Sequence, residues 1–118
     1  MKKLLILIIL LFVNNANATT IPFIRGLYDV PSFSSLYIDE DSIVEFDSLW
    51  GSVTEMRGVA NINCEEIITF YRNAMPNLGW NIYSDDEGDI SFVRQGFNLK
   101  IVYKDVGSQC AVSFSQNN

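Results

Sequence analysis

The sequence predicts a single α+β domain in which one helix packs on an antiparallel sheet of about five to six strands, in two layers and in the order ββαββββ. Two observations lead to this prediction. Several short segments alternate between apolar and polar residues, which is typical of a sheet covered on one face only. Between them lies one longer segment whose apolar residues recur at helical spacing. The predicted domain covers residues 36–118.

Residues 1–18 have the pattern of a cleavable secretory signal peptide. Lys2-Lys3 precedes an unbroken apolar run from Leu4 to Val13, and Ala16-Asn17-Ala18 is the small-x-small pattern that a signal peptidase accepts. As a helix, that run would cover about half of a bilayer core, which needs roughly 20 residues. We therefore expect cleavage after Ala18 and export of the remaining chain. An uncleaved membrane anchor is the alternative.

The composition of the mature chain, residues 19–118, excludes several kinds of chemistry. Its net charge falls from −6 to −8 because Lys2 and Lys3 leave with the signal peptide, and such a surface repels the phosphates of nucleic acid and anionic lipid. The chain has no histidine, so it can form neither a serine–histidine nor a cysteine–histidine nucleophile pair and lacks the usual zinc ligand. We expect no enzymatic activity, no cofactor and no transmembrane segment in the mature chain.

Residues 19–35 are predicted to form an extended N-terminal arm. The stretch contains Pro22 and Pro31 and has no helical period, but it is too apolar for a solvated linker. We expect the arm to pack on its own domain, because isolated apolar segments are costly in water. A partner-binding segment is the alternative.

The first strands are predicted to form a β-hairpin. Residues 42–47 alternate and are β-prone, residues 48–52 have turn character, and residues 53–60 return as a second strand. Gly58 lies inside that second strand, where a glycine is a marker of a β-bulge.

The clearest helix begins at Asn63. Its side chain can accept a hydrogen bond from the backbone N–H of Glu66, and Glu66 can reach back, which is the capping-box pattern. Pro76 and Gly79 predict that the helix ends between residues 75 and 78. The expected buried stripe consists of Ile67, Phe70, Tyr71, Ala74 and Leu78.

Four short strand signals follow the helix. The alternation is clearest in the last two, where Leu99 and Ile101, and later Val112 and Phe114, alternate with polar or small residues. The predicted strands cover residues 80–84, 89–95, 99–104 and 110–115, with turns at 85–88, at Gly96 and at 105–108.

The helix end carries a motif that is seen elsewhere. The segment Phe70-Tyr71-Arg72-Asn73-Ala74-Met75-Pro76-Asn77-Leu78-Gly79-Trp80 resembles a pattern of uncharacterised small exported proteins of alphaproteobacteria, in which a helix ends in Phe-Tyr, then Pro, then Gly-Trp. Glu45-Phe46-Asp47, Gly51 and Phe92-Val93-Arg94-Gln95-Gly96 also look like those proteins. The resemblance implies an envelope or periplasmic setting in a Gram-negative cell, and it supplies no catalytic residues.

The two cysteines, Cys64 and Cys110, leave two alternatives open. In an exported domain they can form a disulfide, which would stabilise the fold by about 4 kcal/mol in the chain-entropy model. They can equally be two separate buried thiols, since the sequence gives no distance between them.

Two acidic clusters are candidate cation sites. Asp39-Glu40-Asp41 is one, and the other consists of Asp85, Asp86, Glu87 and Asp89 around a glycine; carboxylate oxygens are the ligands that Ca²⁺ prefers. Close carboxylates could also act as a general acid and base. The alternative is a solvated turn, in which aspartate bonds to nearby backbone and glycine supplies positive φ.

Trp50 is the strongest candidate for a partner contact. It lies with Leu49 at the predicted hairpin tip, where exposed aromatic residues often mark binding. The alternative is that Trp50 folds onto the sheet edge or the arm. Arg57, Arg72 and Arg94 could form an anion site, but scattered surface ion pairs are the expected arrangement.

These observations predict a non-catalytic, exported domain that binds another envelope protein. We expect it in the periplasm of a Gram-negative bacterium. A small-molecule or divalent-cation-binding module that uses the acidic turns is the alternative.

Overall fold

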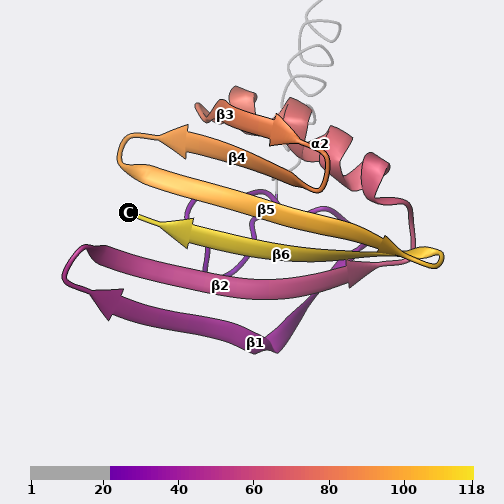
Figure 1. Cartoon of the computed structure of the whole chain (residues 1–118), viewed down its shortest axis with the longest axis horizontal. Helices are drawn as coiled ribbons and strands as arrows, with labels where there is room; N and C mark the ends of the chain where they lie inside the picture. The colour runs from indigo at the N-terminus through magenta and orange to yellow at the C-terminus, as the bar shows by residue number, and fades with distance from the viewer. Residues whose placement is uncertain (1–21) are drawn as a thin grey trace, which may run out of the picture.

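Six antiparallel strands form one continuous sheet in the computed structural model, which describes residues 22–118 (Figure 1). The elements in chain order are β1 (Leu36–Ser48), β2 (Gly51–Ala60), α2 (Cys64–Asn77), β3 (Asn81–Asp86), β4 (Asp89–Arg94), β5 (Phe97–Val106) and β6 (Gln109–Asn117). The α+β class and the order ββαββββ are therefore confirmed for this part of the chain. The predicted signal peptide, its cleavage point after Ala18 and the first residues of the predicted arm lie outside the described residues.

The strand order across the sheet is β1-β2-β6-β5-β4-β3, and all neighbours are antiparallel. β1 and β2 form the predicted hairpin, and α2 carries the chain to the far edge, from which β3 to β6 return as a meander ending beside β2. The turn from β4 to β5 shows how tightly the strands are joined. Gln95 (φ 44°) and Gly96 (φ 88°) both have positive φ, as a two-residue type I′ turn requires.

One face of the sheet is covered by α2 and by residues 22–35; we call the other side the open face. Figure 1 views the open face, with the indigo N-terminal segment passing behind β5, β6 and β2. Inward side chains of the four central strands form the core together with that segment and the helix, which confirms the alternation predicted for β5 and β6. The buried residues of these strands are Met56, Ala60, Ile90, Phe92, Leu99, Ile101, Cys110, Val112, Phe114 and Gln116.

The helix begins where the sequence predicts, but the predicted capping box is wrong. Asn63 is the N-cap residue, yet its side chain makes no capping hydrogen bond, and the N–H of Glu66 donates to the backbone carbonyl of Asn63 (3.2 Å). The N–H of Cys64 instead donates to Oδ1 of Asp105, at 2.9 Å, from the end of β5. A carboxylate is favourable there because it meets the positive end of the helix dipole.

The buried stripe of α2 is displaced around the helix from the predicted one. The buried residues are Cys64, Ile67, Ile68, Tyr71 and Met75, so Ile68 and Met75 were missed. Three predicted members, Phe70, Ala74 and Leu78, are only half-buried. Phe70 lies at the border of the core, where its ring meets that of Phe33 edge-on at 5.0 Å. The helix ends at Asn77, within the predicted range.

The N-terminal segment is part of the core. Ile24, Leu27 and Val30 are buried against the sheet. Gln116 of β6, a buried polar side chain, holds the segment by its backbone: Oε1 accepts from the N–H of Tyr28 (2.7 Å) and Nε2 donates to the carbonyl of Tyr28 (2.9 Å). Because both polar groups of the amide are satisfied, its burial costs little.

Two aromatic residues fasten the same segment from the helix side. The hydroxyl of Tyr71 donates to the carbonyl of Pro31 (2.8 Å), and Nε1 of Trp80 donates to the carbonyl of Asp29 (3.0 Å). Arg94 forms an ion pair with Asp29 (2.8 Å). Phe70, Tyr71 and Trp80 of the helix-end motif therefore pack the segment onto the domain.

β1 bulges at its acidic stretch. Asp39 lies opposite Arg57 and Val44 opposite Glu55, so residues 40–43 face a single residue of β2. Oγ of Ser42 accepts a hydrogen bond from the backbone N–H of Arg57 (2.9 Å) and replaces a missing partner of the ladder.

The bulge predicted at Gly58 is wrong. Gly58 keeps a regular register with Ile38 on one side and Val112 on the other. A Cβ at this position would lie 2.9 Å from the carbonyl oxygen of Tyr37. Glycine is therefore needed there for a close approach of β1 rather than for an extra residue.

Candidate functional site

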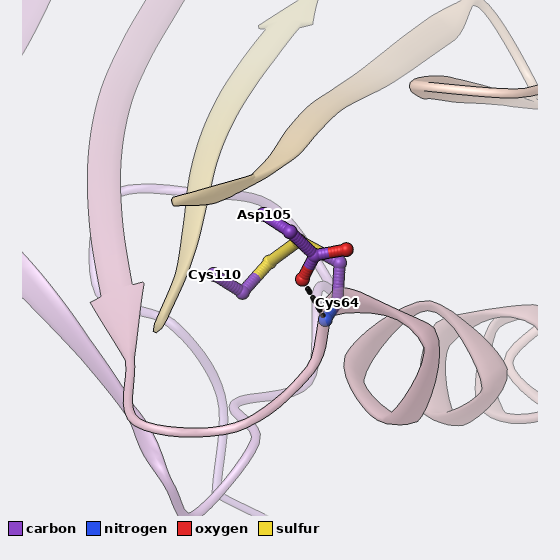
Figure 2. Close-up of side chains that lie close together, drawn as sticks. All are labelled: Cys64, Asp105 and Cys110. Atoms are coloured by element: carbon purple, nitrogen blue, oxygen red, sulfur yellow. Dashed lines mark hydrogen bonds between the residues drawn. A yellow bond between two sulfur atoms is a disulfide. The ribbon is translucent and has the colours of Figure 1, made fainter. Parts of the chain in front are cut away.

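Cys64 and Cys110 form a disulfide, with their Cα atoms 4.9 Å apart (Figure 2). Of the two alternatives that the sequence left open, the bonded one is observed. Both residues are buried, and the bond ties the start of α2 to the middle strand β6 across a separation of 46 residues.

Asp105 lies beside the disulfide. Figure 2 shows its carboxylate against the helix start, where it accepts the hydrogen bond from Cys64. Within residues 22–118, Cys64, Asp105 and Cys110 are the one group of three metal-ligating side chains that lie within 4.8 Å of one another. Because its two sulfurs are bonded to each other, neither is a thiolate that could bind a metal. The cluster is structural.

The carboxylates of the acidic turn after β3 do not converge on a common point. Asp86 and Asp89 pair across the hairpin and Glu87-Gly88 makes the turn, with Gly88 at φ 95°. Asp85 forms an ion pair with Arg72 (2.8 Å), and this hydrogen-bonded guanidinium lowers the pKa of the Asp85 carboxyl. In the described part of the chain these residues form no group of three converging ligands. The geometry is that of a solvated turn.

The second acidic cluster, Asp39-Glu40-Asp41, occupies the bulge of β1. Oδ1 of Asp39 accepts a hydrogen bond from the N–H of Asp41 (3.1 Å), as in an Asx turn, and all three side chains are exposed. Charges on an edge strand oppose pairing with a strand of another molecule.

The three arginines do not converge. Arg72 pairs with Asp85 and Arg94 with Asp29, each at 2.8 Å, which confirms the expected scattered ion pairs for these two. Arg57 makes no ion pair within residues 22–118. Its side chain belongs to the open face, because its neighbours Met56 and Gly58 belong to the covered one.

Leu49 and Trp50, which we call the knob, form the turn between β1 and β2. Leu49 is 97% exposed and Trp50 is 90% exposed, so the exposed alternative for Trp50 is the observed one. The N-terminal segment, in contrast, packs beneath the covered face. The knob and the segment therefore do not form a shared apolar patch.

Hydrogen bonds hold the turn that carries the knob. Oγ of Ser48 accepts from the N–H of Trp50 and donates to the carbonyl of Gly51, both at 3.1 Å. Oδ1 of Asn118 accepts from the N–H of Ser52 (3.0 Å). Figure 1 shows the hairpin tip and the C-terminus at the same end of the sheet.

Exposed apolar side chains continue from the knob along the open face of β1. Phe46 and Val44 are each about half exposed, and they lie opposite Val53 and Glu55 of β2. On the same face, Val102 of β5 is also about half exposed.

The open face is hollowed over β6. We call this hollow, of about 530 Å³, the trough. Its lining combines apolar side chains, serines and charged groups from four strands. The lining residues are Ser42, Val44, Glu55, Met56, Arg57, Lys100, Val102, Ser113, Phe114 and Ser115.

Sequence reasoning missed the trough as a site. It singled out Arg57 but not Lys100, Ser113 or Ser115, because these residues meet only once β6 is known to lie between β2 and β5. The outward serines of the alternating segment 110–115 were the one available signal. Side chains at every second position of a strand point to the same face, so small residues at these positions leave a depression between the longer side chains of the neighbouring strands.

Among residues 22–118, no helix combines the length and the apolar character needed to cross a membrane. No protein-family model, curated protein or solved structure matches the chain. The resemblance to exported proteins of alphaproteobacteria stays a prediction from the motif alone.

Proposed function

We propose that this chain is an exported, non-catalytic domain of the cell envelope that binds another envelope protein through the knob. The observation that carries the proposal is the exposure of Leu49 (97%) and Trp50 (90%) side by side at a hairpin tip. Burial of one large apolar side chain gains about 1.5–3 kcal/mol, so an exposed pair is a surface that gains from a partner. Tryptophan is also enriched among the residues that dominate interface energies.

The way the turn is held supports the same function. The hydrogen bonds from Ser48 and Asn118 fix the backbone on both sides of the knob. A pre-organised turn has less freedom to lose on binding, which lowers the entropic cost of association. We propose that the sheet and the helix form a two-layer scaffold. The β1–β2 hairpin, the longest of the sheet, carries the knob at its tip.

Export is supported by two independent features. The segment from Lys2 to Ala18 has the signal-peptide pattern, and Cys64 and Cys110 are bonded, as is common in exported domains and rare in the cytosol. We place the protein in the periplasm of a Gram-negative bacterium on the helix-end motif. The cation-binding alternative has less support, because Asp85 is committed to Arg72.

Two matched variants test this function. Trp50→Ala removes the aromatic side chain of the knob, while Tyr83→Ala removes one that is 76% exposed on β3, at the opposite edge of the sheet. Tagged chains are recovered from envelopes after cross-linking in cells. A specific partner is expected with the parent and Tyr83→Ala, and we expect Trp50→Ala to bind it about 30-fold more weakly, which corresponds to a loss of ~2 kcal/mol.

Equal capture by all three chains would show that the knob is not the binding element. Both substitutions are at exposed positions, so the unfolding free energy of each variant is expected to stay within about 0.5 kcal/mol of the parent. This control separates a lost contact from a lost fold.

A further inference from the structure

The trough has a low floor between two higher walls. Ser113 and Ser115 of β6 project from the open face, and their short side chains form the floor. Arg57 on β2 lies opposite Ser113, and Lys100 on β5 lies opposite Ser115. Two long basic side chains therefore rise on either side of a row of hydroxyls.

The polar groups of the trough are available for a ligand. Within residues 22–118, neither Arg57 nor Lys100 forms an ion pair, whereas Arg72 and Arg94 do. In the same described residues, the hydroxyls of Ser113 and Ser115 make no hydrogen bond to another protein group. The trough thus offers two free cations and two free hydroxyl donors.

The two basic residues of the trough contrast with the acidic net charge of the whole molecule. The mature chain is strongly acidic, with six basic residues against 14 acidic ones once Lys2 and Lys3 are removed, yet two of those six open into one hollow. Glu55 also lines the trough and offsets one of the two positive charges. The lining residues together keep one positive charge, while Asp39 lies opposite Arg57 just outside the lining. Lys100 and Arg57 remain able to donate hydrogen bonds to a ligand that carries carboxylates.

The trough is continuous with the surface beside the knob. Val44 lines the trough, and Phe46 follows two residues later on the same face of β1, toward Leu49 and Trp50. A polypeptide that covers the knob and runs along this apolar strip reaches the trough. A small carboxylate in the trough alone would leave the knob exposed.

We infer that the trough binds an acidic segment of the partner polypeptide, whose carboxylates accept hydrogen bonds from Arg57, Lys100 and the two serine hydroxyls. The inference rests on the proposed function, since it names the chemistry of the partner that the knob contacts. A charge-assisted hydrogen bond is stronger than a neutral one, so the two cations are the groups on which affinity depends most.

The test is an NMR titration of isotope-labelled protein purified after export. The probe is an eight-residue peptide with four glutamates, and its counterpart carries four glutamines. We expect saturable shifts of the amides of Ser113 and Ser115 with the glutamate peptide only. In Arg57→Gln/Lys100→Gln the affinity should fall about tenfold or more.

The matched control is Arg25→Gln/Lys104→Gln, which removes the same two charges at exposed positions that do not line the trough. It should change the affinity less than threefold. An equal loss in both double variants would overturn the inference, because it would reduce the effect to overall charge. Equal shifts with free glutamate would show that the trough does not require a polypeptide ligand. Dimers that form with rising protein concentration in the absence of peptide would assign the trough to a second copy of this chain.

The two proposals fail separately. If the titration gives no shifts while Trp50→Ala still weakens partner capture as predicted, the trough inference is wrong and the knob function stands. If the glutamate peptide binds but Trp50→Ala captures the partner normally, the knob function is wrong.

Discussion

Reduction of the Cys64–Cys110 bond is predicted to remove a large share of the stability of the domain. The bond closes a loop with a sequence separation of 46 residues. In the chain-entropy model a loop of that length restricts the unfolded chain by about 4 kcal/mol at 25 °C. Domains of this size are typically stable by ~5–15 kcal/mol, so the reduced protein should be marginal.

The assay is urea unfolding followed by tryptophan fluorescence, with and without dithiothreitol. For an assumed slope of about 2 kcal/mol per molar urea, a loss of ~4 kcal/mol lowers the midpoint by roughly 2 M. Trp80 is buried and reports on the core, whereas Trp50 is exposed and should change little.

The control is the double variant Cys64→Ala/Cys110→Ala. It should unfold at the same urea concentration with and without reductant, at or below the midpoint of the reduced parent. If thiol titration proves that the parent is fully reduced and its midpoint moves by less than about 0.5 M, the loop-closure reasoning is refuted.

Three further changes follow from buried contacts. Gln116→Leu leaves the backbone N–H and carbonyl of Tyr28 without their partners and should cost about 2–4 kcal/mol in urea unfolding; a loss below ~0.5 kcal/mol would contradict the role of Gln116. Gly58→Ala places a Cβ 2.9 Å from the carbonyl oxygen of Tyr37 and should cost roughly 1–3 kcal/mol in urea unfolding; an unchanged unfolding midpoint would contradict the close approach of β1. Burial raises the pKa of the Tyr71 phenol well above its ordinary value, so the neutral form is favoured in the folded state. The stability that this provides is present below about pH 10, the ordinary tyrosine pKa, and is lost as the pH rises above it; a Tyr71→Phe variant should lose less stability between about pH 9 and 11, and parallel curves for both proteins would refute this.

Local patterns predicted the elements that depend on local spacing. The helix starts after Asn63 and ends at Asn77 as expected, because the N-cap position and the Gly79 stop are properties of the adjacent sequence. The alternation of residues 110–115 was enough to assign inward and outward side chains of β6.

Features that depend on a distant partner were not predictable. Asp105 caps α2 from 41 residues away, and no helical pattern contains that information. The bulge lies at residues 40–43 of β1 and not at Gly58. A glycine is needed at position 58 because the carbonyl oxygen of Tyr37 on the neighbouring strand approaches it closely. The predicted stripe fits helical spacing as well as the observed one, which contains Ile68, and only packing on the rest of the domain decides which of the two is buried.

The candidate site was predictable only in part. The turn position of Leu49 and Trp50 identified the knob, but its exposure depended on where the N-terminal segment packs. The acidic turns matched cation chemistry by residue type, yet Asp85 pairs with Arg72 across 13 residues. The trough required the strand order, because Arg57 and Lys100 come from strands that are joined only through β6.

The central claim is that Trp50 contacts another protein outside the cytoplasm. The most direct measurement places a photo-cross-linking phenylalanine analogue at position 50 in intact cells, and at position 83 as the matched exposed site. We expect one discrete cross-linked envelope protein at position 50, joined to a chain that begins at Thr19, and none at position 83. Equal labelling at both positions, or no adduct at position 50, would contradict the account.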